Sequence, residues 1–298
     1  MGKVLKNTFK QSIFSIPFLI GFLFSLGMGI YEVTVFSPDF LLYEESLPKT
    51  GVFGYLYFIV AAFCAVSSGR EIAAGAVRNM LIAGARKTHI FFSHIIVNLI
   101  AAVLFFAAAL VPMLIGCHQY FEMFEAYMLL KIFASLLAGY LVIVSITTLF
   151  TLMTNNHIAA LIVCLCVTFI LIYADSIIKS KLMQVRYYSE TVSVDGNEKE
   201  YVDENFLYVG GTARKLLWTI KSCLPYETVD YSIEYLSEML TSEKAVKQKL
   251  QEFKDNNEDI EYRTERVSQF NYGPIVSAGV FVLLTGFGAF MFKRNNLK

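Results

Sequence analysis

Six long apolar runs limit the possible folds of this chain more than any other feature. They cover residues 13–31, 52–67, 90–117, 128–154, 158–174 and 272–292. A helix needs roughly 20 apolar residues to cross about 30 Å of hydrocarbon, and a backbone in lipid must satisfy its own hydrogen bonds. The second and fifth runs are short, and we expect them to borrow residues from their flanks. The sequence therefore predicts an all-α polytopic membrane protein with six transmembrane helices.

The charges between the runs indicate an orientation. If the amino end is inside, segments 1–12, 68–89 and 293–298 are cytoplasmic, and they hold ten Lys and Arg against one acid, Glu71. The short loops on the other side hold six acids and one basic residue, Lys49. Because short cytoplasmic loops are rich in Lys and Arg, we expect both termini to be cytoplasmic.

Three parts follow from this topology. Residues 1–175 form a transmembrane domain with the first five helices, residues 176–271 an extracytoplasmic insertion, and residues 272–298 the last helix with a basic tail. Two runs that contain Tyr and Val flank Asp195-Gly196, which predicts a hairpin, and residues 213–224 and 231–254 are expected to be helices. We expect a small α+β cap of one hairpin plus helices, resting on the outer membrane face.

The amino-terminal segment 2–12 is basic and amphipathic. Val4, Leu5 and Phe9 share one helical face, and three lysines occupy the others. The pattern fits a short helix in the inner interface, and it fits a basic flank equally well. A basic flank before an apolar run also occurs in signal peptides, but the length of this run and the five runs after it favour a retained helix.

The segment between the second and third runs is too polar to span a membrane and too apolar for a floating loop. An interfacial helix would turn four apolar side chains toward lipid or protein: Ile72, Val77, Leu81 and Ile82. It would leave four polar side chains available to a cytosolic partner: Arg70, Glu71, Arg78 and Asn79. An ordinary membrane-surface helix in a basic loop is the alternative.

This segment, "GREIAAGAVRNMLIAGARKTHIFFSHIIVNLI" (69–100), resembles the permease subunits of type-2 ATP-binding-cassette exporters. A pattern close to E-R-x-x-G-T-x-x-N/R-L-L follows the second span in that family. The residues that match it in kind and order are Glu71, Gly75, Arg78, Asn79, Leu81 and Arg86. The segment "YVGGTARKLLWTIKSCLPYE" (208–227) is similar to one in firmicute permeases of this class, and the six spans, large insertion and basic tail also fit.

The resemblance implies that residues 70–88 contain a coupling helix that docks into a separate cytosolic ATPase. The residues expected to take part are Arg70, Glu71, Gly75, Arg78, Asn79 and Arg86. It also implies a second permease chain, identical or related, in a bacterial plasma membrane with its lipid. The partner ATPase would bind ATP and Mg²⁺, and the complex would export an amphipathic substrate such as a peptide, drug or lipid.

Several function classes find no support in the sequence. It has no G-x-x-x-x-G-K-[ST] loop for nucleotide phosphates, no H-E-x-x-H or G-x-S-x-G motif, and no Cys/His spacing typical of a metal site. We therefore expect no catalytic residue, metal or cofactor in this chain, and its formal net charge of zero gives no reason to expect a nucleic-acid partner. The runs also enclose no charge suited to an ion relay, which disfavours a small-ion pump. Whether Cys117 and Cys223 pair is left open.

Two polar residues of the third run, His94 and Asn98, are four apart and so share a helical face. They are either contacts in a transport pathway or partners in interhelical hydrogen bonds, and the second interpretation is favoured. The alternative to the exporter is a membrane-anchored sensor or immunity protein that binds a ligand through its extracytoplasmic cap.

Overall fold

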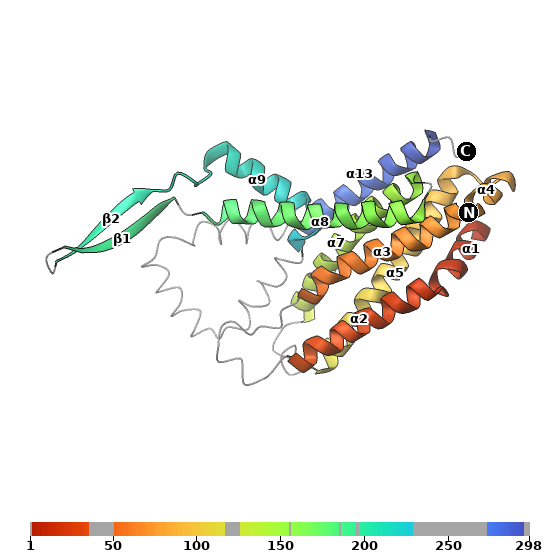
Figure 1. Ribbon diagram of the computed structural model, residues 1–298, viewed down its shortest axis with the longest axis horizontal. Helices are drawn as coiled ribbons and strands as arrows, with labels where there is room; N and C mark the ends of the chain where they lie inside the picture. Colours follow the sequence, from red (N-terminus) through yellow and green to blue (C-terminus); the bar gives the residue numbers. More distant parts are fainter. Residues whose placement is uncertain are drawn as a thin grey trace.

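The computed structural model describes residues 2–35, 51–116, 126–154, 156–184, 186–194, 197–228 and 273–294. Its helices form an elongated bundle, shown in Figure 1. The start of α1 and the end of α13 lie at one end of the bundle, which we call the termini end. The two strands lie beyond the opposite end, which we call the hairpin end.

Six helices are long and apolar enough to cross a membrane. They are α2 (Ile16–Val35), α3 (Gly51–Ala73), α5 (Lys87–Gly116), α7 (Ala126–Met153), α8 (His157–Leu182) and α13 (Gly273–Arg294). The prediction of a helical polytopic membrane protein is confirmed at this level. The orientation of the chain in a membrane stays a prediction.

The two short runs extend into their flanks, as expected. α3 continues past residue 67 to Ala73 and so includes Glu71. α8 continues past residue 174 through Asp175 to Leu182, so the predicted domain boundary between 175 and 176 was wrong and falls inside a helix. In both places a charged side chain is buried against another helix, which allows the helix to continue past the end of the apolar run.

The helix α1 (Gly2–Ile13) precedes the first span and is separated from it by a short break. The Ser15 hydroxyl donates to the Ser12 carbonyl at 2.6 Å in this break. Pro17 follows in the first turn of α2, where its missing N–H costs no helical hydrogen bond. α1 packs on α5 with Thr8 and Ser12 buried, so residues 2–12 do form a helix, while its place in the inner membrane interface stays a prediction.

The core lies between α3, α5 and α7. Aromatic side chains fill it, and among the largest fully buried ones are Phe53, Tyr57, Phe105 and Tyr140. α3 and α7 are the most buried spans, whereas few residues of α2, α8 and α13 are fully buried. In a membrane protein these outer faces are the ones in contact with lipid or with another membrane chain.

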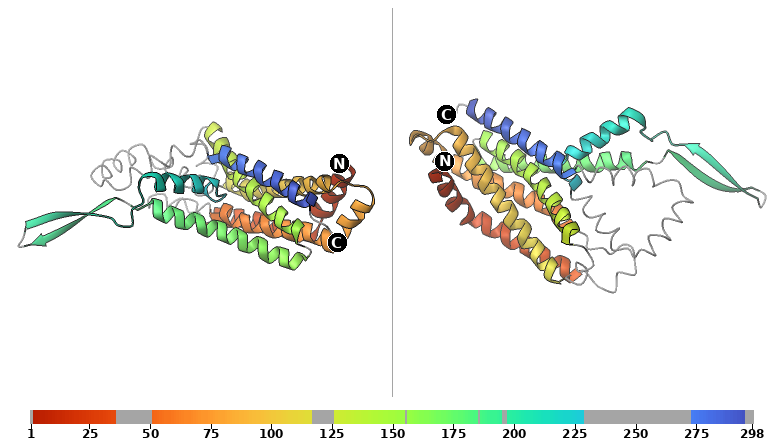
Figure 2. Two further views of the ribbon diagram at one scale, coloured as in Figure 1. Left: turned by 90° about the horizontal axis from the view of Figure 1, so that it is seen from above. Right: turned by 180° about the vertical axis from the view of Figure 1, so that it is seen from behind.

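A hairpin and a helix occupy the hairpin end. β1 (Tyr187–Val194) and β2 (Asn197–Glu204) pair antiparallel, with Tyr187 opposite Glu204 and Val194 opposite Asn197. The strands therefore lie where the sequence predicted them, while residues 195–196 and 229–272 fall outside the described part of the chain. The hairpin projects away from the bundle in every view (Figures 1 and 2).

The described residues do not support the compact α+β cap that the sequence suggested. The two strands contain many charged and hydroxyl residues, and an isolated two-stranded sheet has little apolar area to bury against a partner. The helix α9 (Gly211–Cys223) returns to the bundle, where it packs on α8 and α13. The predicted helix over 231–254 and Cys117 lie outside the described residues.

Candidate functional site

The segment between α3 and α5 folds into a short helix flanked by two glycine turns. α4 (Ala76–Ile82) has Gly75 before it and Gly84 after it, with φ values of 72° and 85°. Such left-handed conformations strain residues that carry a side chain. The backbone N–H of Ala85 donates to the Met80 carbonyl at 2.9 Å, which closes the end of α4. Residues 70–88 thus comprise the last turn of α3, the turn at Gly75, α4, a second turn and the start of α5, all at the termini end (Figure 1).

One face of α4 packs into the protein. Val77 is buried in a small apolar cluster with Ile90 and Phe91 of α5 and Phe292 of α13. Four partly buried residues pack against that cluster from the same segment: Ile72, Met80, Leu81 and Ala85. Ile82 does not join them and is 76% exposed. The helix is therefore held to two long helices through its apolar face.

The other face of α4 is open. Arg78 and Asn79 are exposed on α4 itself, and Arg70 and Arg86 are exposed in the flanking turns. These four residues lie on one connection, and together they present three positive charges and an amide at the termini end. Four of the residues expected to meet a partner are therefore accessible.

Glu71 is the exception, and the expectation that it faces a cytosolic partner was wrong. It is 7% exposed, and its Oε1 atom accepts a hydrogen bond from the Ser12 hydroxyl of α1 at 3.3 Å. Its Oε2 atom lies 3.6 Å from Nε2 of His94 on α5. The Ser67 hydroxyl donates to the Ser12 hydroxyl at 2.8 Å, which extends the cluster along α3. Successive helical residues point about 100° apart, so Glu71 faces the bundle while Arg70 faces outward.

His94 and Asn98 do share a buried face, each with 1% exposure. The Asn98 Nδ2 atom donates to the Ser68 hydroxyl of α3 at 3.2 Å and to the Thr148 hydroxyl of α7 at 2.8 Å. These bonds favour the interpretation of Asn98 as an interhelical link. His94 instead contacts Glu71. The sequence placed Glu71 in the docking segment and His94 in the third span, yet the two side chains belong to one buried polar cluster.

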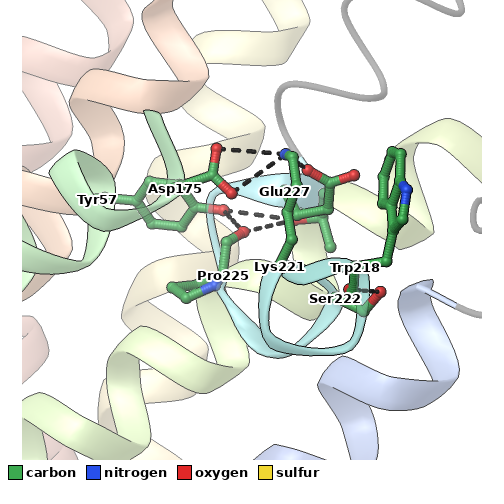
Figure 3. A network of polar contacts seen from close by, with 8 residues as sticks. Tyr57, Asp175, Trp218, Lys221, Ser222, Pro225 and Glu227 are labelled. Atoms are coloured by element: carbon green, nitrogen blue, oxygen red, sulfur yellow. Dashed lines mark hydrogen bonds and ion pairs between the residues drawn. The ribbon is translucent and has the colours of Figure 1, made fainter. Parts of the chain in front are cut away.

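A second buried polar cluster joins α9 to the bundle, and the sequence analysis missed it. Figure 3 shows Lys221 of α9 between Asp175 of α8 and Glu227. The Lys221 ammonium lies 3.3 and 3.5 Å from the two Asp175 oxygens and forms an ion pair with Glu227. The Lys221 side chain is 0% exposed and that of Asp175 is 1% exposed. One signal for this cluster was available in the sequence, the acid Asp175 at the edge of the fifth apolar run. Its partner Lys221, however, is 46 residues away.

The chain after α9 is fixed to the core through Tyr57 of α3. The Tyr57 hydroxyl donates to the Pro225 carbonyl at 2.7 Å, and the Thr228 hydroxyl donates to the same carbonyl at 2.8 Å (Figure 3). The Tyr57 ring packs 4.7 Å from that of Tyr140, measured between centroids. Gly139 of α7 leaves the room for this contact, since a Cβ there would lie 2.7 Å from the Pro225 oxygen. The segment at 225–228 is thus seated against α3 and α7.

These clusters correct one expectation about charge. The apolar runs were expected to enclose no charge suited to an ion relay, yet the carboxyl groups of Glu71 and Asp175 are buried within spanning helices. Among the described residues, no group of three or more His, Cys, Asp or Glu side chains is placed to hold a metal ion. Searches against protein-family models, curated proteins and solved structures found no match to this chain.

Proposed function

We propose that this chain is the membrane-spanning permease subunit of a type-2 ATP-binding-cassette exporter. The resemblance of residues 69–100 and 208–227 to that family suggests it. The observation that carries it is the form of α4, a short helix fixed by Val77 to the bundle and exposing Arg78 and Asn79 at the termini end. A partner that grips the exposed face of α4 would move a rigid element.

The packing of α4 gives such a movement a route into the membrane. Val77 shares its cluster with Phe91 of α5 and Phe292 of α13, and Phe91 packs 6.0 Å from Phe292 between ring centroids. A displacement of α4 would therefore shift two spanning helices with it, because close-packed side chains transmit strain. The closing of two ATPase subunits on ATP is the kind of motion that would drive it.

The proposed assembly follows from the number of docking elements. One chain offers one α4, whereas a dimer of ATPase subunits presents two clefts. We therefore propose two permease chains, identical or related, with two cytosolic ATPase subunits that bind ATP and Mg²⁺. The excess of Lys and Arg over acids in 1–12, 68–89 and 293–298 supports a cytoplasmic location for the termini end, in a bacterium.

The proposed cargo is amphipathic, such as an antimicrobial peptide, drug or lipid-like molecule. The mostly apolar, aromatic-rich spans offer such a molecule a compatible surface. The hairpin, α9 and residues 229–272 would then lie outside the cell.

The test is purification of the tagged chain from its native membranes in a gentle detergent, with mass spectrometry of the proteins that remain bound. We expect an ATP-binding-cassette ATPase to remain bound to the wild-type chain. Arg78→Glu should weaken that association by about 2–5 kcal/mol, which is roughly 30-fold to several-thousand-fold in affinity. Lys10→Glu makes the same charge change at an exposed site of α1 and should leave the ATPase bound.

The alternative predicts a different result. A membrane-anchored sensor or immunity protein would show no ATPase with the wild-type chain. Equal recovery of the ATPase with Arg78→Glu and Lys10→Glu would mean that α4 is not the docking element. Either result would contradict the proposal.

A further inference from the structure

The contact between Glu71 and His94 is a buried acid–base pair inside the membrane-spanning part of the chain. Oε2 of Glu71 on α3 lies 3.6 Å from Nε2 of His94 on α5, and the two side chains are 8% and 1% exposed. Ionisable side chains are costly at such positions and usually have a function. This pair needs an account of its own, since the proposed docking of α4 does not use it.

The hydrogen bonds around the pair are incomplete. Glu71 accepts one bond, from Ser12, through Oε1. Within the part of the chain that the structure describes, Glu71 Oε2 and both ring nitrogens of His94 have no hydrogen-bond partner. Buried polar atoms rarely lack one. Two such side chains, each more than nine-tenths buried and facing the other, indicate a ligand between them.

Among the residues that the structure describes, the surroundings supply no other charge to balance the pair. The elements packed nearby carry several charged side chains, and these are exposed: Lys3, Lys6 and Lys10 on α1, Arg70 on α3, Arg78 on α4, and Lys293 and Arg294 on α13. The remaining charged or histidine side chains described in this half of the bundle are Arg86, which is exposed just before α5, Lys87 and His89 at the start of α5, and His157 at the start of α8. Lys87 donates to the Lys293 carbonyl at 3.4 Å, and the backbone of His157 lies against Gly69. The buried polar residues of α7 at this depth carry hydroxyl groups: Thr147, Thr148 and Thr151.

The protonation state then decides the cost of burial. An ionised Glu71 beside a neutral His94 would leave one buried negative charge without a cation, which costs several kcal/mol. One proton removes that charge, either as a carboxylic acid beside a neutral imidazole or as a carboxylate beside an imidazolium. We propose that Glu71 and His94 form a binding site for one proton.

The proton is linked to the position of α1. With one proton, an N–H or O–H can bridge the two side chains once the 3.6 Å separation closes to the 2.7–3.2 Å of a hydrogen bond. Loss of the proton leaves a carboxylate that needs water, and Ser12 of α1 covers that carboxylate. α1 therefore shields a deprotonated pair from water. The proton site does not depend on the exporter proposal, and each has its own test.

The test counts protons on the pair in the full chain, held in lipid nanodiscs at about pH 7. His89, His118 and His157 are replaced by Gln so that His94 is the one remaining histidine, and ¹⁵N ring labelling then reports its charge. Infrared difference spectra between this chain and the same chain with Glu71→Gln report whether Glu71 is a carboxylic acid. The expected result is one proton: a charged ring with an ionised carboxylate, or a neutral ring with a carboxylic acid.

Two further results distinguish a shared proton from a bound metal ion and from two groups that titrate independently. If the ring is charged, Glu71→Gln should weaken proton binding at His94 at least tenfold. Lys10→Gln, at an exposed position of α1, should change that binding less than twofold. If the carboxyl holds the proton, His94→Gln should change its infrared band. Zero or two protons on the pair would overturn the proposal. So would a stoichiometric divalent metal ion, found by elemental analysis, that Glu71→Gln removes.

Discussion

Lys221→Met should release α9 from the bundle. The substitution removes the cation between Asp175 and Glu227 while keeping a long unbranched side chain. Lys221 and Asp175 have side-chain exposures of 0% and 1%, so the remaining carboxylates are left in a site that little water reaches. Loss of one partner of a buried ion pair costs about 3–5 kcal/mol, which corresponds to a roughly 150-fold to several-thousand-fold change in an equilibrium constant.

Hydrogen exchange followed by mass spectrometry, on the chain in nanodiscs, measures this cost where it arises. The extensive contacts of α9 with other described elements are those with α8 and α13. We therefore expect the amides of α9 to lose protection while those of α3 and α7 keep theirs. Lys215→Met is the matched control, since Lys215 is exposed on the same helix. Protection in α9 that falls equally, or not at all, in both variants would refute the assignment of Lys221 as the link.

Three smaller predictions use reversible unfolding in mixed micelles. Gly139→Ala should lower the free energy of unfolding by about 1–3 kcal/mol, because the new Cβ would lie 2.7 Å from the Pro225 oxygen. Gly27→Ala is its control and should cost no stability, since no heavy atom lies within 4 Å of a Cβ at that position. Gly75→Ala should cost about 1–2 kcal/mol, because φ is 72° there, and an unchanged stability would mean that the turn does not hold this conformation. Asn98→Ala should cost roughly 1–3 kcal/mol for two interhelical hydrogen bonds, and a loss below about 0.5 kcal/mol would contradict their contribution.

The sequence predicted the six spans because a membrane helix needs only length and apolar character, which can be counted along the chain. It failed where a helix continues past a charge. Glu71 and Asp175 were each treated as the end of a span or as a solvent contact, yet each is buried with a basic partner from another helix. Such partners, 23 and 46 residues away, depend on how the helices pack, and one sequence does not give that.

The sequence also predicted α9 as a helix but not which of its faces is buried. In a water-soluble helix Leu216 and Ile220 would point inward. Here they are 60% and 43% exposed, while Lys221 and Trp218 are buried. The ion pairs of Lys221 with Asp175 of α8 and with Glu227 reverse the usual pattern, so amphipathic spacing alone predicts the helix and leaves its orientation undecided.

The same limit applied to the candidate docking segment. The sequence located the short element between the second and third spans and four of its exposed residues correctly: Arg70, Arg78, Asn79 and Arg86. It grouped Glu71 with them because Glu71 is a polar residue of this segment and matches the family pattern. The helix places Arg70 and Glu71 on different sides of α3, and α1 covers the second.

Site-specific photocrosslinking at position 79 tests the central proposal most directly. Asn79 is exposed on α4, so a photoreactive amino acid placed there should not disturb the buried face of that helix. The proposal predicts an ultraviolet-dependent adduct with an ATP-binding-cassette ATPase in intact cells, whereas the same amino acid at Lys10 gives none. If position 79 yields no ATPase adduct while the chain is present at its normal level, α4 is a membrane-surface helix and not a coupling helix.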